Sequence, residues 1–189
     1  MGASLAEHRV LLSFAREDAA FATRMGNLIT ELGAAILPRD ESNLMGADIK
    51  GNLRGRLMQA TMIIVLIGST TRFSRWVDIE IEFSTKPTKE GPGAGLIGVV
   101  LPTHDDFSKP YYEPELVPLR LHDRILAEYA ILRKWSDDPL EVADWLSEAD
   151  RRRHQYDSTP SIRALIELRH FPWSKDADVQ SSSKDIGQS

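Results

Sequence analysis

Short apolar runs alternate along the chain with stretches in which apolar residues recur every three or four positions. The run over residues 61–67 is apolar on both faces, which is typical of a central strand in a parallel sheet that is covered on each side. Residues 117–120 have a weaker pattern that predicts a short edge strand. Together the runs predict buried strands at residues 9–14, 34–37, 61–67 and 96–101.

The stretches between these runs predict helices. Apolar residues spaced i, i+4, i+7 and i+8 predict a helix over residues 16–32, and Gly33 suits its C-terminal end. A second helix is predicted over residues 45–60. A third begins after Ser74, which can cap it, and runs to about residue 86. Helical spacing returns further along the chain, at residues 125–132, 142–149 and 162–166.

The alternation of strands and helices predicts an α/β fold. The expected architecture is a flavodoxin-like three-layer sandwich with a central parallel sheet of about five strands, plus C-terminal helices. Residues 8–120 would form this domain, and residues 121–173 a helical extension packed on it. Residues 174–189 are rich in Ser, Asp and Lys and have almost nothing to bury, so they are expected to be a disordered tail.

Composition narrows the classes of function. The 189 residues carry a formal net charge of -5, so no basic excess exists to neutralise a nucleic-acid backbone. The chain has no cysteine, which excludes thiolate metal sites and cysteine nucleophiles, and its histidines lack metal-ligand spacing. No apolar run approaches the about 20 residues that a membrane span needs. We therefore expect a cytoplasmic protein without a metal, a nucleic-acid partner or a membrane partner.

One charged residue lies in an apolar helical stripe. Trp76, Ile79, Glu80 and Phe83 fall at i, i+3, i+4 and i+7, so they share one face of the third predicted helix, and Glu80 is its single charge. A carboxylate that faces inward is costly unless it is paired or hydrogen-bonded. Glu80 therefore has two interpretations: a structural group that pairs with a nearby arginine or a hydroxyl donor, or a functional carboxylate.

The position of this helix favours the functional interpretation. In sheets of this class, ligands bind beyond the carboxyl ends of the strands, where the strand order reverses. Residues 68–71 follow the central predicted strand and come just before the helix of Glu80. A phosphoacceptor receiver and a flavodoxin are rejected, because the loops of this chain lack the aspartate of the first and the glycine-rich phosphate loop of the second.

Two segments of the chain resemble TIR domains. His8–Phe14, followed by Asp18, is similar to their first strand and first loop. Val65–Ser69, followed by Arg75–Ile81, is similar to their third strand and their Trp-x-x-x-Glu helix. The chain resembles most the TIR-like proteins of Thoeris antiphage systems, the sensor subunits that process NAD. The resemblance covers about residues 8–120.

This resemblance implies a NAD glycohydrolase or ADP-ribosyl cyclase that cleaves the nicotinamide–ribose bond of NAD. Glu80 would be the catalytic glutamate, NAD would be the substrate, and no cofactor would be needed. The product would be an ADP-ribose-derived immune signal, cyclic, linear or conjugated. It would diffuse to a separate effector protein after a phage-derived trigger. Proteins of this kind work as assemblies, so a homo-oligomer is also implied.

The resemblance also implies a set of substrate-binding residues around Glu80. The first strand and loop would line the nicotinamide–ribose end, and the loop after the second strand would move to admit substrate. Trp76 would form a wall or a stacking surface. The set consists of Ser13, Phe14, Asp18, Arg39, Asp40, Gly68, Ser69 and Trp76.

Two other functions stay open at the level of sequence. The first is a TIR-like module that has kept the fold without activity and serves as a scaffold or binds a nucleotide signal. The second is an enzyme similar to nucleoside deoxyribosyltransferases, which have a related fold and a catalytic carboxylate. Glu80 beside an open cleft would favour an enzyme, and a closed or filled cleft would favour the scaffold.

Overall fold

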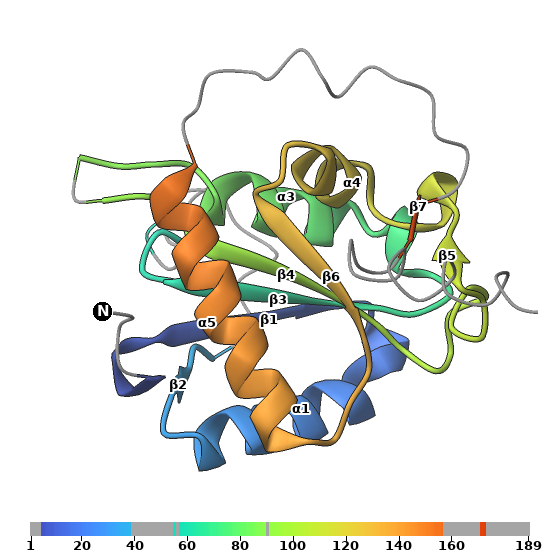
Figure 1. Ribbon diagram of the computed structural model, residues 1–189, viewed down its shortest axis with the longest axis horizontal. Coiled ribbons are helices and arrows are strands. Elements are labelled where there is room, and N and C mark those ends of the chain that lie inside the picture. Colours follow the sequence, from blue (N-terminus) through green and yellow to red (C-terminus); the bar gives the residue numbers. More distant parts are fainter. Residues whose placement is uncertain (1–4, 39–54, 56, 90, 157–170, 173–189) are drawn as a thin grey trace, which may run out of the picture.

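A parallel sheet forms the centre of the molecule. The structure is a computed structural model that describes residues 5–38, 55, 57–89, 91–156 and 171–172. Within these residues, five parallel strands lie in the order β2-β1-β3-β4-β6 (Figure 1). The order confirms the flavodoxin-like α/β prediction, and it reverses between β1 and β3. The strands are β1 (Arg9–Phe14), β2 (Ala35–Ile36), β3 (Met62–Ile67), β4 (Gly95–Val100) and β6 (Ala130–Lys134).

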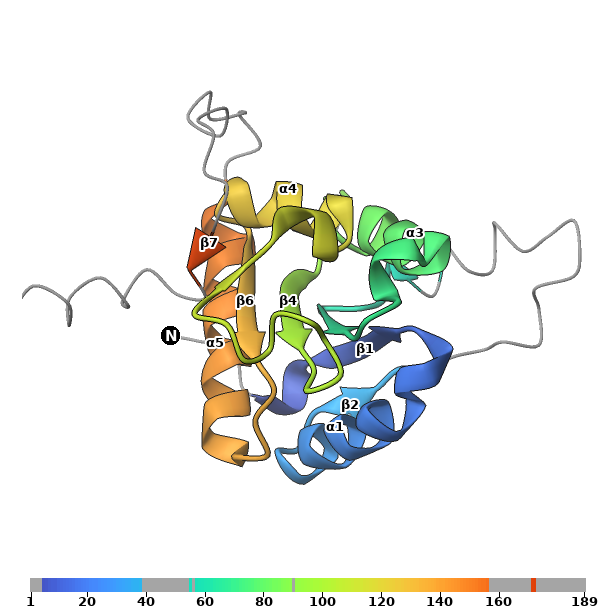
Figure 2. The same cartoon turned by 90° about the vertical axis from the view of Figure 1, so that its right-hand side faces the viewer.

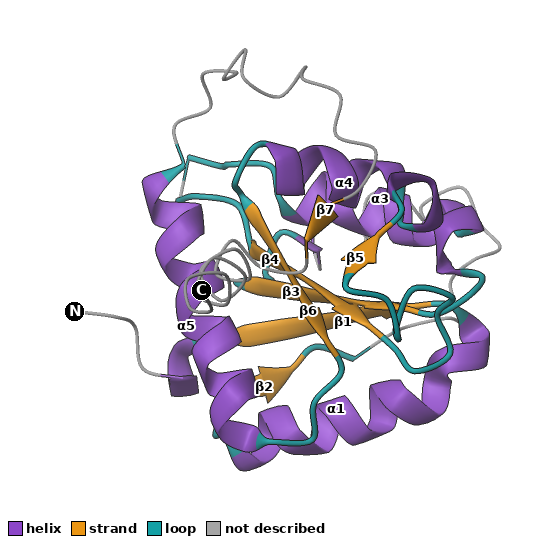
Figure 3. Ribbon diagram, turned by 45° about the vertical axis from the view of Figure 1, so that its right-hand side comes forward, coloured by secondary structure: helices purple, strands orange, loops and turns teal. Residues whose placement is uncertain are grey.

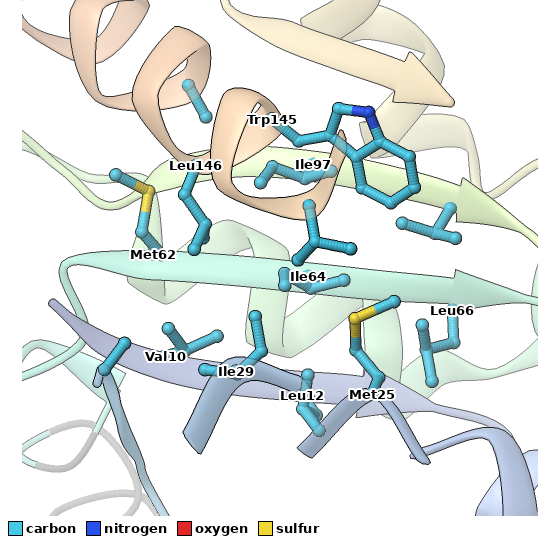
Figure 4. Close-up of a cluster of buried hydrophobic side chains, with 14 of the residues drawn as sticks. Val10, Leu12, Met25, Ile29, Met62, Ile64, Leu66, Ile97, Trp145 and Leu146 are labelled. Carbon is cyan, nitrogen blue, oxygen red and sulfur yellow. The ribbon is translucent and has the colours of Figure 1, made fainter. Parts of the chain in front are cut away.

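Helices cover both faces of the sheet, which gives three layers (Figure 2). On one face, α1 (Ala19–Glu31) and α5 (Pro139–Gln155) pack in the same apolar cluster, part of which Figure 4 shows. On the other face, α3 (Arg75–Ser84) and α4 (Leu119–Leu126) pack in a second cluster. Short 3-10 helices occupy the connections: η1 (Leu5–Glu7), η2 (Arg16–Asp18), η3 (Thr71–Phe73) and η4 (Pro114–Leu116).

Strand β3 separates the two apolar clusters. Met62, Ile64 and Leu66 belong to the cluster under α1 and α5. The residues between them, Ile63 and Val65, belong to the cluster under α3 and α4. Successive side chains of a strand point to opposite faces, so a strand that is apolar throughout is buried on both sides. The predicted central position of this strand is confirmed.

Helix α3 begins where its sequence predicts. Ser74 is its N-cap, and its Oγ accepts a hydrogen bond of 3.4 Å from the Val77 backbone N–H. The helix ends at Ser84, two residues before the predicted end. The predicted helix over residues 45–60 lies mostly outside the described residues.

The fifth strand differs from the prediction. The expected edge strand at residues 117–120 is wrong, because α4 begins at Leu119. The fifth strand of the sheet is β6, which begins ten residues after the end of the predicted strand. A positive φ of 59° at Glu128 ends the helical turn, and the chain enters β6 two residues further on. Tyr129 and Leu132 both pack in the cluster of α3 and α4, so their spacing resembled a helical stripe. The sheet thus continues past residue 120.

A second, two-stranded sheet lies beside the main one (Figure 3). Its strands β5 (Tyr111–Tyr112) and β7 (Phe171–Pro172) pair in antiparallel orientation. The predicted extension over residues 121–173 therefore contributes α4 in part, β6, α5 and β7 in its described residues. The predicted helix at 162–166 and the tail at 174–189 lie outside them.

Candidate functional site

Glu80 lies in the interior, between α3 and the sheet. Its exposed fraction is 0%, as the helical stripe predicts for an inward position. Asp78 and Glu82 leave the same helix on its other side, where both pair with Arg120 and Glu82 also pairs with Lys86. Glu80 is therefore distinguished from its acidic neighbours by burial.

Two uncharged donors bind the Glu80 carboxylate. The Ser13 hydroxyl donates a hydrogen bond of 2.6 Å to Oε2, and the Trp76 indole N–H donates one of 2.8 Å to Oε1. Buried polar groups need such partners, and each oxygen here has one. These two hydrogen bonds hold the carboxylate in a defined orientation inside a largely apolar layer.

Regular secondary structure brings the three side chains together. Trp76 precedes Glu80 by four residues, and helical side chains lean toward the N-terminus, so Glu80 points back at Trp76. Ser13 is near the carboxyl end of β1, opposite Val65 of β3. It shares a face of β1 with Leu11, which packs in the cluster of α3 and α4. The site thus lies at the carboxyl edge of the two strands between which the strand order reverses.

Asp18 binds two other loops of the same edge. It is 4% exposed, and its carboxylate accepts hydrogen bonds of 3.4 Å from Thr71 and 3.3 Å from Thr103. These residues follow β3 and β4 respectively. Burial raises the pKa of Asp18 above its ordinary value. Asp18 therefore connects the loops after β1, β3 and β4.

Gly68 provides the space for this connection. A Cβ at this position would overlap the Asp18 carboxylate. The Gly68 N–H donates a hydrogen bond of 2.9 Å to Thr71 Oγ1, which in turn faces Asp18. A side chain at this position would therefore disturb the Asp18 contacts, so the glycine is required by packing.

The remaining predicted site residues have different positions. Phe14 packs against the cluster of α1 and α5, on the face of the sheet opposite to Ser13. Ser69 is exposed in the loop after β3. Arg39 and Asp40 lie outside the described residues. The structure thus brings Ser13, Trp76 and Glu80 into direct contact and places Gly68 and Asp18 in a neighbouring network.

Thr71 and Thr103 were not among the predicted site residues, although both belong to loops at the carboxyl ends of strands, where ligands bind in sheets of this class. The loop after β4 has further buried polar groups. His104 Nδ1 accepts a hydrogen bond of 3.1 Å from the Asp106 N–H, and the Asp106 carboxylate forms an ion pair of 2.7 Å with Lys109. These contacts give His104 and Asp106 structural roles in shaping the loop.

The described residues contain no group of three or more His, Cys, Asp or Glu side chains placed to hold a metal ion. Among the helices that the structure describes, none combines the length and hydropathy needed to span a bilayer.

The comparison with known families assigns this α/β domain to the TIR-like class. Residues 13–106, about half of the chain, match the model of the family described as Thoeris protein ThsB, TIR-like domain. The chain belongs to this family across that segment, which includes Ser13, Asp18, Gly68, Trp76 and Glu80.

Comparison with solved structures also returned TIR domains. Those of the activated Roq1 resistosome, in a structure described as directly recognizing the pathogen effector XopQ, share 16% identity with the chain. The alignment covers 78% of this chain and 84% of that chain, with a TM-score of 0.43. No curated protein matches the chain.

Proposed function

We propose that the chain is a TIR-type NAD glycohydrolase or ADP-ribosyl cyclase that cleaves the nicotinamide–ribose bond of NAD. The observation that carries the proposal is the buried Glu80 carboxylate, held by Ser13 and Trp76 at the ligand-binding edge of the sheet. Membership of the TIR-like Thoeris ThsB family supports it. The catalytic residue in this proposal is Glu80.

The chemistry needs one carboxylate and no metal. The bond between ribose C1′ and the nicotinamide nitrogen breaks, and its electron pair goes to that nitrogen, so nicotinamide leaves as a neutral molecule. The ribose ring becomes oxocarbenium-like, as in glycoside hydrolysis. A fixed carboxylate stabilises this positive charge and orients the ribose hydroxyls. Water then adds to C1′ and loses a proton, or a second nucleophile takes the place of water and gives a cyclic or conjugated product.

The neighbouring residues have supporting roles in the proposal. Ser13 orients the carboxylate and lines the nicotinamide–ribose end. Phe14, the last residue of β1, is proposed to line that end from the opposite face of the strand. Gly68 and Ser69 form the edge of the site after β3, and Asp18 braces that loop. Arg39 and Asp40 belong to the loop that is proposed to move and admit the substrate.

The proposed biological role is the production of an immune signal in antiphage defence. NAD is the substrate, and the ADP-ribose-derived product acts on a separate effector protein. A phage-derived trigger starts the reaction, and a homo-oligomer is the proposed active form. The proposed location is the cytoplasm, where NAD is available.

One observation favours a second candidate function. Glu80 is fully shielded from solvent, and a site that stays closed suits a TIR-like scaffold or a module that binds a nucleotide signal. The two functions differ in one respect that can be measured: only the enzyme releases nicotinamide.

The test is incubation of the purified protein with NAD, alone and with lysate of phage-infected cells, followed by mass spectrometry of the products. We expect nicotinamide release that Glu80→Gln abolishes and Glu82→Gln preserves. Glu82 is the matched control, because it lies on the same helix but pairs with Lys86 and Arg120 at the surface. Absence of release under every condition, or full release by Glu80→Gln, would overturn the proposal. Transfer of a deoxyribosyl group in a parallel assay would indicate the deoxyribosyltransferase alternative.

A further inference from the structure

Ser13 and Trp76, which both donate to the Glu80 carboxylate, differ in their freedom to move. Ser13 is 0% exposed and belongs to a strand in the interior of the sheet. Trp76 is partly exposed and lies in the first turn of α3. Withdrawal of the indole moves a ring that already touches solvent, whereas withdrawal of Ser13 would require a shift of β1.

A fully shielded carboxylate cannot act on a substrate. Reacting groups must approach to about 3–3.5 Å, so at least one oxygen of Glu80 has to be uncovered before the reaction. Oε1, which accepts from Trp76, is the oxygen whose donor is partly exposed. A ribose hydroxyl can replace the indole N–H there, because both groups donate one hydrogen bond to a carboxylate.

We infer that Trp76 gates Glu80: its indole N–H occupies Oε1 in the resting protein, and a substrate hydroxyl takes its place while Ser13 keeps Oε2. The inference rests on the proposed function. Trp76 is a positioning residue in this scheme, and the substrate competes with its side chain for one carboxylate oxygen. The competition raises the concentration of NAD that the resting protein needs.

Kinetics test the competition directly. Trp76→Phe keeps an aromatic ring and removes the N–H, so the competing hydrogen bond is lost. We expect the KM for NAD to fall about 3- to 10-fold, the factor that one hydrogen bond of ordinary strength provides, while kcat changes less than about 3-fold. A KM that is unchanged or higher would overturn the gate, and a loss of kcat alone would assign Trp76 a structural role.

The matched control is Trp135→Phe. The Trp135 indole nitrogen is buried without a hydrogen-bond partner in the described residues, and its ring packs edge-on against Phe21, 5.1 Å between centroids. This substitution also removes an indole N–H, but Trp135 packs against the cluster of α1 and α5, on the face of the sheet opposite to α3. We expect Trp135→Phe to leave KM and kcat unchanged. An equal fall of KM in Trp135→Phe and Trp76→Phe would overturn the gate.

A binding measurement separates the gate from the proposed function. The chain has four tryptophans, so nitrogen-15 labelling gives four indole signals, and Trp76→Phe assigns one of them. Titration of Glu80→Gln with NAD, which blocks turnover, should shift the Trp76 indole signal and speed its hydrogen exchange. NAD-induced shifts elsewhere with an undisturbed Trp76 signal would overturn the gate alone. Absence of any shift, together with absence of nicotinamide release by the unsubstituted protein, would overturn the proposed function and the gate with it.

Discussion

The Ser13 hydroxyl donates a hydrogen bond of 2.6 Å to Glu80 Oε2 across 67 positions of sequence. The bond connects β1 to α3, and both side chains are completely shielded from solvent. Strand β1 is paired with a neighbouring strand on each side. The orientation of the carboxylate is therefore set by the sheet as well as by the helix that carries it.

Removal of this hydroxyl should reduce turnover more than binding. In Ser13→Ala, Oε2 loses its donor in the interior, which costs about 1–3 kcal/mol of unfolding free energy. The carboxylate also loses its orientation, so we expect kcat for nicotinamide release to fall by about 10- to 100-fold while KM changes little. Urea unfolding and nicotinamide kinetics measure the two effects.

Ser147→Ala is the control for this prediction. Its hydroxyl also donates a hydrogen bond, but to the Ala143 carbonyl on the exposed side of α5. It should leave both quantities almost unchanged. An unchanged kcat in Ser13→Ala would show that Glu80 needs no orientation from β1.

The sequence predicts the fold well where apolar burial dominates. Residues 62–67 are apolar without interruption, and β3 contributes side chains to both apolar clusters. The prediction failed at the fifth strand, because Tyr129 and Leu132 lie on one face of the molecule with helical spacing. The turn between α4 and β6 depends on a positive φ at Glu128, which is a non-glycine residue and gives no sequence signal of a break.

The site could be predicted only in part, because some of its contacts join segments that are distant in the sequence. Helical periodicity identifies Glu80 as an inward charge, because residues four positions apart share a face. Periodicity cannot identify Ser13 as its partner, since that contact joins distant segments. The contacts of Thr71 and Thr103 with Asp18 likewise depend on how three loops meet at the edge of the sheet.

Gly68→Ala should destabilise the domain, because the added Cβ overlaps the Asp18 carboxylate. We expect a loss of about 1–3 kcal/mol in unfolding free energy, as for other overpacked interiors. Gly26→Ala is the matched control in α1, where the Cβ would lie 3.7 Å from Leu12 Cδ1, an ordinary contact. It should stabilise the protein by about 0.5–1 kcal/mol through helix propensity. Equal effects of the two substitutions in urea unfolding would contradict the packing argument.

Asp18 should make stability depend on pH in the acid range. Burial raises its pKa above the ordinary value of 3.8, so the folded protein binds the proton more tightly than the unfolded chain. The contribution of Asp18 to stability is therefore largest below 3.8 and declines as pH rises through the folded pKa. Asp18→Asn removes this decline and can still bind Thr71 and Thr103, so its unfolding free energy relative to the unsubstituted protein should rise with pH across that window.

The control for Asp18 is Asp144→Asn, an exposed position on α5. Urea unfolding at a series of pH values should give parallel curves for this variant and the unsubstituted protein. Parallel curves for Asp18→Asn as well would show that the buried carboxyl does not carry the effect.

His8 should produce the opposite dependence nearer neutrality. It is 2% exposed at the start of β1, and burial lowers its pKa below the ordinary value of 6.5, although Asp150 acts in the other direction. Below pH 6.5 the unfolded chain therefore binds a proton at His8 more readily than the folded protein does. The contribution of His8 to the unfolding free energy is fully present above pH 6.5 and is lost as pH falls through the folded pKa. We expect His8→Gln to flatten the fall of unfolding free energy between about pH 7 and pH 5, the range in which histidines titrate.

Charged groups around His8, and a second histidine whose pKa is lowered, also contribute to the pH dependence. Arg153 and His154 oppose its protonation, whereas Glu7 and Asp150 favour it. Burial also lowers the pKa of His122, so part of the slope should persist in His8→Gln and disappear in the double variant His8→Gln/His122→Gln. His154→Gln, at an exposed position, is the control and should retain most of the slope. An unaltered slope in the double variant would show that neither His8 nor His122 is responsible for the pH dependence.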